Sequence, residues 1–156
     1  MPESTEVHAL QARLFKDIPL ARHLGVEVII VEAGAVKLRA PLAANSNHKG
    51  TAFGGSLYSL AVLAGWGMLS TALERRGVSA EVVIQDAHVD YATPVTGDFT
   101  ASAALPDAEA LERCLAMLSR RGRGRIALTA VIEQGGAAAV TLRGTFVIHR
   151  TSQGEA

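Results

Sequence analysis

The sequence predicts a single α+β domain in which an antiparallel sheet curls around one long apolar helix. The chain has 156 residues, which suits one compact domain over residues 1–156, and 49% of them are hydrophobic while 19% are charged. Residues 55–76 read as a continuous helix with apolar side chains all the way round, which is typical of a helix enclosed by other elements. Most of the other segments show the two-residue alternation of half-buried strands.

The first elements are a short helix and a hairpin. Val7, Leu10 and Leu14 recur at helical spacing, so an amphipathic helix is expected near the start of the chain. The hairpin is predicted from alternation, with one strand over residues 26–32 and another over residues 35–42.

The long central helix is predicted to end at Gly77, which is suited to the C-cap position. At about 1.5 Å per residue it would be roughly 30 Å long. Residues 51–73 contain no charge, so a membrane-spanning helix is the alternative. The glycines and hydroxyl residues of this stretch, together with the amphipathic strands elsewhere, favour a core helix. We therefore expect no membrane partner.

Further strands follow, and a short helix interrupts them. These strands are expected over residues 81–94, 98–105, 123–133 and 137–150. The short helix is expected after Asp107, whose carboxylate can cap it. An antiparallel sheet curled around a long helix is the hotdog fold. Such a sheet leaves an open edge, so we expect a homodimer or a dimer of dimers paired through the long strand at residues 81–94.

Charge and cysteine content exclude several classes of protein. Fifteen Lys and Arg residues balance fifteen Asp and Glu residues, so the net positive charge typical of nucleic-acid-binding proteins is absent. The one cysteine, Cys114, cannot form an internal disulfide, and no export segment is apparent, so a cytoplasmic location is expected. The histidines lack metal-ligand spacing, and no metal is expected.

Two blocks of residues resemble a known family. The first runs from Asn47 to Tyr58 (Asn-His-Lys-Gly-Thr-Ala-Phe-Gly-Gly-Ser-Leu-Tyr). The second runs from Ile84 to Tyr91 (Ile-Gln-Asp-Ala-His-Val-Asp-Tyr), and Pro-Val-Thr-Gly-Asp follows at residues 94–98. They resemble a family of thioesterase-like domains of the hotdog superfamily, which also occurs behind acetyltransferase domains. This resemblance implies hydrolysis of an acyl-CoA or an acyl-carrier protein, with coenzyme A present only as part of the substrate.

The first block is also similar to the Asn-x-x-Gly-x-x-His-Gly-Gly pattern of phenylacetate-pathway acyl-CoA thioesterases. By this resemblance, Asn47 matches an asparagine that helps to position the substrate. Two positions depart from the pattern. Phe53 stands where those enzymes have histidine, and Val62 stands where they have a catalytic acid in the helix. The usual base or nucleophile is therefore missing from its usual place.

The glycine pair, Gly54 and Gly55, is the predicted oxyanion site. Backbone N–H groups at a helix start have no intrahelical acceptor, and glycine allows a carbonyl to approach closely. The alternative is a tight turn with close packing. Neighbouring residues of the same block are predicted to bind substrate: His48, Thr51, Phe53, Ser56, Leu57 and Tyr58.

Asp86 is the predicted base that activates water, with His88 as its partner or as the base itself. Asp86, His88 and Asp90 alternate along one strand and are expected to share a face with Val82 and Ile84. A neighbouring carboxylate and imidazole suit general base catalysis near neutral pH. The alternative is a solvated face. Asn47 is expected either beside the attacking water or as a cap of its own loop.

Arg123 belongs to a cluster that is predicted either to bind the phosphates of coenzyme A or to form a solvated turn. The cluster contains Arg120, Arg121, Arg123 and Arg125. The rival to a hydrolase is a non-catalytic acyl-binding or regulatory hotdog module that has lost the acid at Val62. The position of Asp86 discriminates the two: a hydrolase needs it to point towards the amides of the glycine pair, and an outward position favours the binding module.

Overall fold

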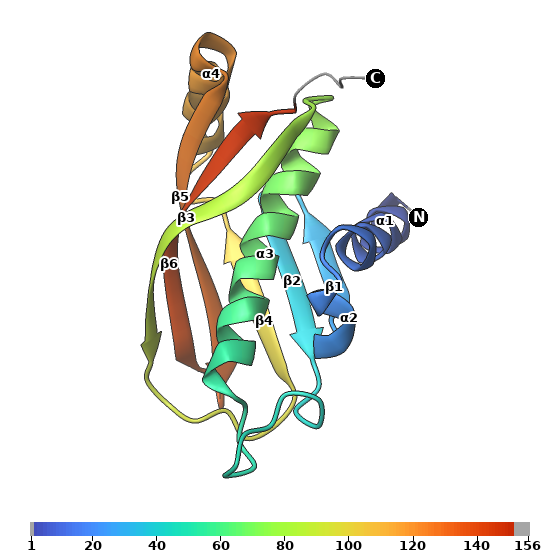
Figure 1. The fold of residues 1–156 in the computed structure, drawn as a ribbon, viewed down its shortest axis with the longest axis vertical. Coiled ribbons are helices and arrows are strands. Elements are labelled where there is room, and N and C mark those ends of the chain that lie inside the picture. The colour runs from blue at the N-terminus through green and yellow to red at the C-terminus, as the bar shows by residue number, and fades with distance from the viewer. Residues whose placement is uncertain (1, 152–156) are drawn as a thin grey trace.

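In the computed structural model, which describes the backbone of residues 2–151 and the side chains of residues 5–151, a six-stranded sheet wraps around helix α3 (Figure 1). The strand order is β1-β2-β4-β5-β6-β3, and each neighbouring pair is antiparallel. The strands are β1 (Glu27–Glu32), β2 (Ala35–Ala40), β3 (Ala80–Tyr91), β4 (Phe99–Ala104), β5 (Arg123–Gln134) and β6 (Ala137–Arg150). The predicted α+β hotdog fold is confirmed.

Helix α3 (Gly54–Arg75) forms the core and lies within one residue of its predicted bounds. An 18-residue window of α3 has a mean hydropathy of 1.4, which is sufficient for a membrane span, but 67% of that window is buried inside the fold. The sheet therefore accounts for its apolar composition. Helix and sheet approach closely at Gly65, where an added Cβ would lie 2.7 Å from Cζ of Phe146.

Three further helices cover the sides of the sheet. Helix α1 (Pro2–Asp17) lies along the β1 side of the sheet, as Figure 1 shows, and α2 (Leu20–Leu24) follows it. Helix α4 (Ala110–Arg121) packs against β5, which begins directly after it. The Asp107 carboxylate accepts hydrogen bonds from the N–H of Glu109 at 2.9 Å and of Ala110 at 2.7 Å, so it holds the start of α4 as predicted.

Strand β3 lies at the edge of the sheet and contains a β-bulge. Ile84 pairs with Phe146 of β6, whereas Asp86 pairs with the next residue, Thr145. Gln85 is therefore an extra residue in β3. Because successive side chains of a strand alternate between faces, this one residue reverses the alternation for the rest of β3.

Candidate functional site

At the start of helix α3, the N–H groups of Gly54 and Gly55 have no acceptor within the helix. Phe53 is the N-cap residue, and its carbonyl accepts hydrogen bonds from the N–H of Ser56 at 3.0 Å and of Leu57 at 3.1 Å. Within the described part of the chain, no hydrogen bond involves the N–H of Gly54 or Gly55. The two amides therefore lie unpaired at the positive end of the helix dipole, where they can bind an anion.

Two exposed aromatic rings flank the glycine pair. Phe53 is 57% exposed and its ring covers Gly55, where an added Cβ would lie 2.5 Å from the ring. Tyr91 is 52% exposed and its ring lies beside Gly54, 3.5 Å from an added Cβ. The Tyr91 hydroxyl donates a hydrogen bond to the Gly54 carbonyl at 3.0 Å. Burial raises the pKa of the Tyr91 hydroxyl, and nearby Tyr58 raises it further, so the hydroxyl is protonated at neutral pH.

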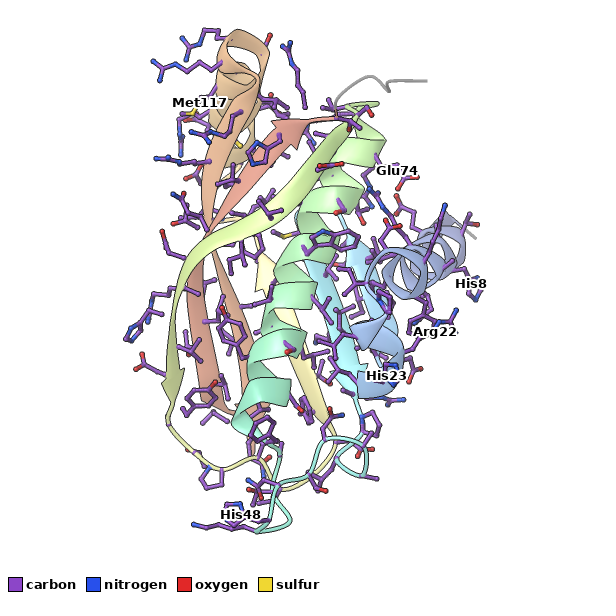
Figure 2. All side chains as sticks on the ribbon, viewed as in Figure 1. His8, Arg22, His23, His48, Glu74 and Met117 are labelled. Carbon is purple, nitrogen blue, oxygen red and sulfur yellow. The ribbon has the colours of Figure 1, made fainter. Side chains whose placement is uncertain are left out.

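The Asn47 side chain folds the loop before α3. Its Oδ1 accepts hydrogen bonds from the N–H of Lys49 at 2.8 Å and of Thr51 at 3.2 Å, and its Nδ2 donates to Thr51 Oγ1 at 2.8 Å. This geometry matches the loop-capping alternative, with Thr51 as the partner of Asn47. His48 is exposed at the tip of the same loop, at the end of the molecule where α3 begins (Figure 2).

Asn45 was not among the predicted site residues, yet it fixes the position of Phe53. It is 3% exposed, and its Nδ2 donates hydrogen bonds to the carbonyls of Leu24 and Pro41, both at 2.8 Å. The backbone carbonyl of Asn45 accepts a hydrogen bond from the N–H of Phe53 at 2.7 Å. Asn45 therefore ties the start of α3 to α2 and to the end of β2. A single asparagine in a polar loop gives no sequence signal for this role.

The predicted substrate-binding residues on α3 differ in burial. Leu57 is 4% exposed and belongs to the core, whereas Ser56 and Tyr58 are half-buried. Val62 is also half-buried and packs against the core cluster. The helix position that carries an acid in the phenylacetate-type pattern is therefore apolar in its surroundings as well as in its side chain.

Asp86, His88 and Asp90 share one face of β3, as predicted, but this face points away from α3. They pair with residues of β6 that alternate with the buried ones, namely Thr145, Arg143 and Thr141. The bulge explains why the prediction that they share a face with Val82 and Ile84 was wrong: Val82 is buried, while the three later side chains are exposed. The sheet therefore separates the Asp86 carboxylate from the glycine pair within one chain.

The polar contacts on this outer face also differ from the expected pair. His88 Nε2 lies 3.3 Å from Asp90 Oδ1, and Arg143 Nη1 lies 3.6 Å from Asp90 Oδ2. The carboxylate that His88 contacts is thus that of Asp90, and not that of Asp86 as expected. Asp86 instead lines a shallow surface cavity of about 330 Å³ together with Ala127 and Thr129 of β5.

Arg123 lies at the opposite end of the sheet from the glycine pair. It pairs with His149, which pairs in turn with Glu81 near the start of β3. Tyr91, beside Gly54, is at the other end of β3, about 33 Å away at the usual rise of an extended strand. One chain does not bring Arg123 to the glycine pair.

The described residues combine an oxyanion-type donor pair with apolar walls. None of their Asp or Glu side chains is hydrogen-bonded at the glycine pair. Within residues 5–151, no group of three or more His, Cys, Asp or Glu side chains is placed to hold a metal ion. The arrangement can stabilise negative charge on a carbonyl oxygen between two aromatic rings.

Comparison with known proteins finds similarity over nearly the whole chain. A family described as "Putative thioesterase (yiiD_Cterm)" matches residues 7–150. A protein of unknown function from Chlorobaculum tepidum TLS is 30% identical, with a TM-score of 0.87 over 93% of this chain and 94% of that one. A putative thioesterase from Shewanella oneidensis is 24% identical (TM-score 0.83; 95% and 99% covered). The PaaI protein of the E. coli phenylacetic acid degradation operon is 18% identical (TM-score 0.66; 96% of both) and shares the fold.

Proposed function

Because the chain belongs to the putative thioesterase family (yiiD_Cterm), we propose that it hydrolyses an acyl thioester carried by coenzyme A or by an acyl-carrier protein. The family supports thioester hydrolysis as the general reaction. The substrate, the residues and the mechanism are our own proposal. In it, water attacks the thioester carbonyl, the thiol leaves, and coenzyme A or the carrier protein is released with the free acid as the second product.

The observation that carries this proposal is the pair of unpaired amides between two exposed rings. The N–H groups of Gly54 and Gly55 can donate to the oxygen that becomes negative as water attacks. Loss of one such donor typically lowers kcat by about 10²- to 10³-fold, so the pair can supply a large part of the rate enhancement. Phe53 and Tyr91 provide apolar surface on both sides for the acyl group.

Activation of water is the step at which a hydrolase and the rival binding module differ. Val62 replaces the helix acid, and Asp86 faces away from the glycine pair; both observations favour a non-catalytic acyl-binding or regulatory module. For the hydrolase, His48 is the better candidate base, because its loop leads directly into α3 and histidine is the side chain that most often acts as a general base. Asn47 then orders the loop that carries His48.

A homodimer is part of the proposal. Strand β3 has 12 residues and lies at the edge of the sheet, with Val83 49% exposed on it. An exposed strand of this length is a template for pairing with a second chain. The molar mass in solution, measured by light scattering, tests this directly: a homodimer has twice the 16.3 kDa of one chain.

The function is tested by thiol release from a panel of acyl-CoAs and acyl-carrier proteins of different chain length, using wild type and His48→Gln. Binding of the same acyl-CoAs is measured by calorimetry. Turnover by wild type that collapses in His48→Gln supports the hydrolase and its base. Turnover that His48→Gln leaves intact keeps the hydrolase and excludes His48. Binding of acyl-CoA without turnover of any substrate in the panel overturns the hydrolase in favour of the binding module.

A further inference from the structure

Tyr91 is hydrogen-bonded to the peptide group that the proposed reaction uses. The Gly54 carbonyl and the Gly55 N–H belong to the same Gly54–Gly55 peptide unit. The Tyr91 hydroxyl donates to that carbonyl at 3.0 Å, while the Gly55 N–H projects from the helix start without a partner among the described residues. Tyr91 therefore touches the opposite end of a proposed oxyanion donor.

A hydrogen bond at a peptide carbonyl strengthens the N–H of the same peptide unit as a donor. Chains of hydrogen bonds polarise one another by perhaps 10–30% per bond. A carbonyl oxygen has two lone pairs, so the Gly54 carbonyl can accept both the Tyr91 hydroxyl and an N–H of its own helix. Glycine has wide backbone freedom, so the peptide plane between Gly54 and Gly55 could otherwise vary in orientation. The hydrogen bond from the Tyr91 hydroxyl restricts that orientation.

The bulge at Gln85 aims Tyr91 at this peptide. Val82 and Ile84 face the core before the bulge, so unbroken alternation would place residue 91 on the outer face. With the extra residue, Tyr91 pairs with Val140, which is buried, and its ring reaches Gly54. Bulges commonly re-aim a side chain beside a functional site.

We propose that Tyr91 is a positioning residue that fixes and polarises the Gly54–Gly55 peptide, so that the Gly55 N–H is a stronger oxyanion donor. This inference rests on the proposed thioester hydrolysis for its effect on rate, but the effect on the peptide itself is independent of any substrate. The Tyr91 ring contributes the contact beside Gly54, and its hydroxyl contributes the polarisation.

Steady-state kinetics of Tyr91→Phe separates these two contributions, since the variant keeps the ring and removes only the hydroxyl. We expect kcat to fall about tenfold, less than for loss of a direct oxyanion donor, with KM within about twofold of wild type. The matched control is Ser79→Ala, which deletes an exposed hydroxyl at the other end of α3 that contacts Thr151 at 3.3 Å, and which should leave kcat unchanged. Equal kcat for Tyr91→Phe and wild type would overturn the proposal.

Nuclear magnetic resonance of the substrate-free protein tests the same proposal without turnover. Removing the hydroxyl should shift the Gly55 amide proton upfield in Tyr91→Phe and leave it unchanged in Ser79→Ala. If wild type hydrolyses no thioester, the proposed function fails, and this shift still decides whether Tyr91 polarises the peptide. An unshifted Gly55 amide would overturn the proposal whatever the kinetics.

Discussion

The start of α3 and the outer face of β3 carry different kinds of polar group, and they lie on opposite sides of the sheet. At the helix start the donors are the unpaired backbone amides of Gly54 and Gly55, which two aromatic rings flank. On the outer face the polar groups are side chains, and His88, Asp90 and Arg143 contact one another in solvent. The first region has two unpaired donors, which we propose receive a ligand atom, whereas in the second region Asp90 is already paired with His88 and Arg143.

The difference between the two regions depends on one residue. Gln85 is the extra residue of the bulge, and it places Tyr91 beside the glycine pair while it turns Asp86 outward. The side-chain period of a strand is two, so a single inserted residue exchanges the faces of everything that follows. A prediction that strand residues face a site therefore fails when a bulge lies between them and the residues that set the buried face.

Replacing Gly54 with proline is expected to have the largest effect, because it deletes the N–H of a proposed oxyanion donor and little else. Gly54 is the first helical residue, where proline is well tolerated, and Phe53 already has the extended conformation that a residue before proline prefers. We expect Gly54→Pro to lower kcat by about 10²- to 10³-fold in the thiol-release assay.

Gly54→Ala is the matched control for that proline. It keeps the N–H and adds a Cβ in ordinary contact with Tyr91, 3.5 Å from the ring. If Gly54→Pro, with an unchanged circular dichroism spectrum, is as active as Gly54→Ala, the N–H of Gly54 takes no part in the reaction.

Deleting Gln85 tests whether the bulge separates the two regions. Without it, either the first half of β3 turns the buried Val82 outward, or the second half turns Asp86 towards the core. Each alternative loses apolar burial or buries a charge, and we expect the free energy of unfolding to fall by roughly 3 kcal/mol, measured by urea denaturation. Gln85→Ala keeps the bulge and should change stability by less than about 0.5 kcal/mol. If the deletion variant has the same free energy of unfolding as wild type, the bulge is not needed to keep Val82 buried and Asp86 exposed.

Two glycines of α3 are expected to respond differently to substitution by alanine. An added Cβ at Gly65 would lie 2.7 Å from Cζ of Phe146, a fully buried side chain. Overpacking of this kind costs about 1–3 kcal/mol, which exceeds the gain of roughly 1 kcal/mol from alanine within a helix. We therefore expect Gly65→Ala to lower, and Gly54→Ala to maintain, the midpoint of thermal unfolding. If Gly65→Ala and Gly54→Ala have the same midpoint, the core around Phe146 can accommodate the added methyl group without loss of stability.

The sequence predicts the fold well because the fold depends on long patterns. The bounds of α3 follow from a long run without charge and a glycine after its end, and the predicted bounds of β6 match the observed ones to the residue. The five-residue helix α2 was missed, since so short a segment shows no periodicity.

The candidate site was harder to predict because it depends on single residues. The glycine pair was found through its motif. The hydrogen bond of Tyr91 to Gly54 joins residues 37 positions apart, and it exists only because of a bulge that leaves no mark in the pattern of Val82 to Asp90. Asn45, buried at a loop base, resembles any polar loop residue in sequence.

Asp86→Asn is expected to have the smallest effect of these substitutions. The Asp86 carboxylate lies on the face of the sheet opposite α3, and His88 and Arg143 contact Asp90 instead of Asp86. We expect kcat/KM to stay within about twofold of wild type, the range of an ordinary surface substitution. A collapse of kcat/KM in a folded Asp86→Asn variant would contradict this separation. It would mean that the outer face of β3 takes part in the reaction together with the start of α3.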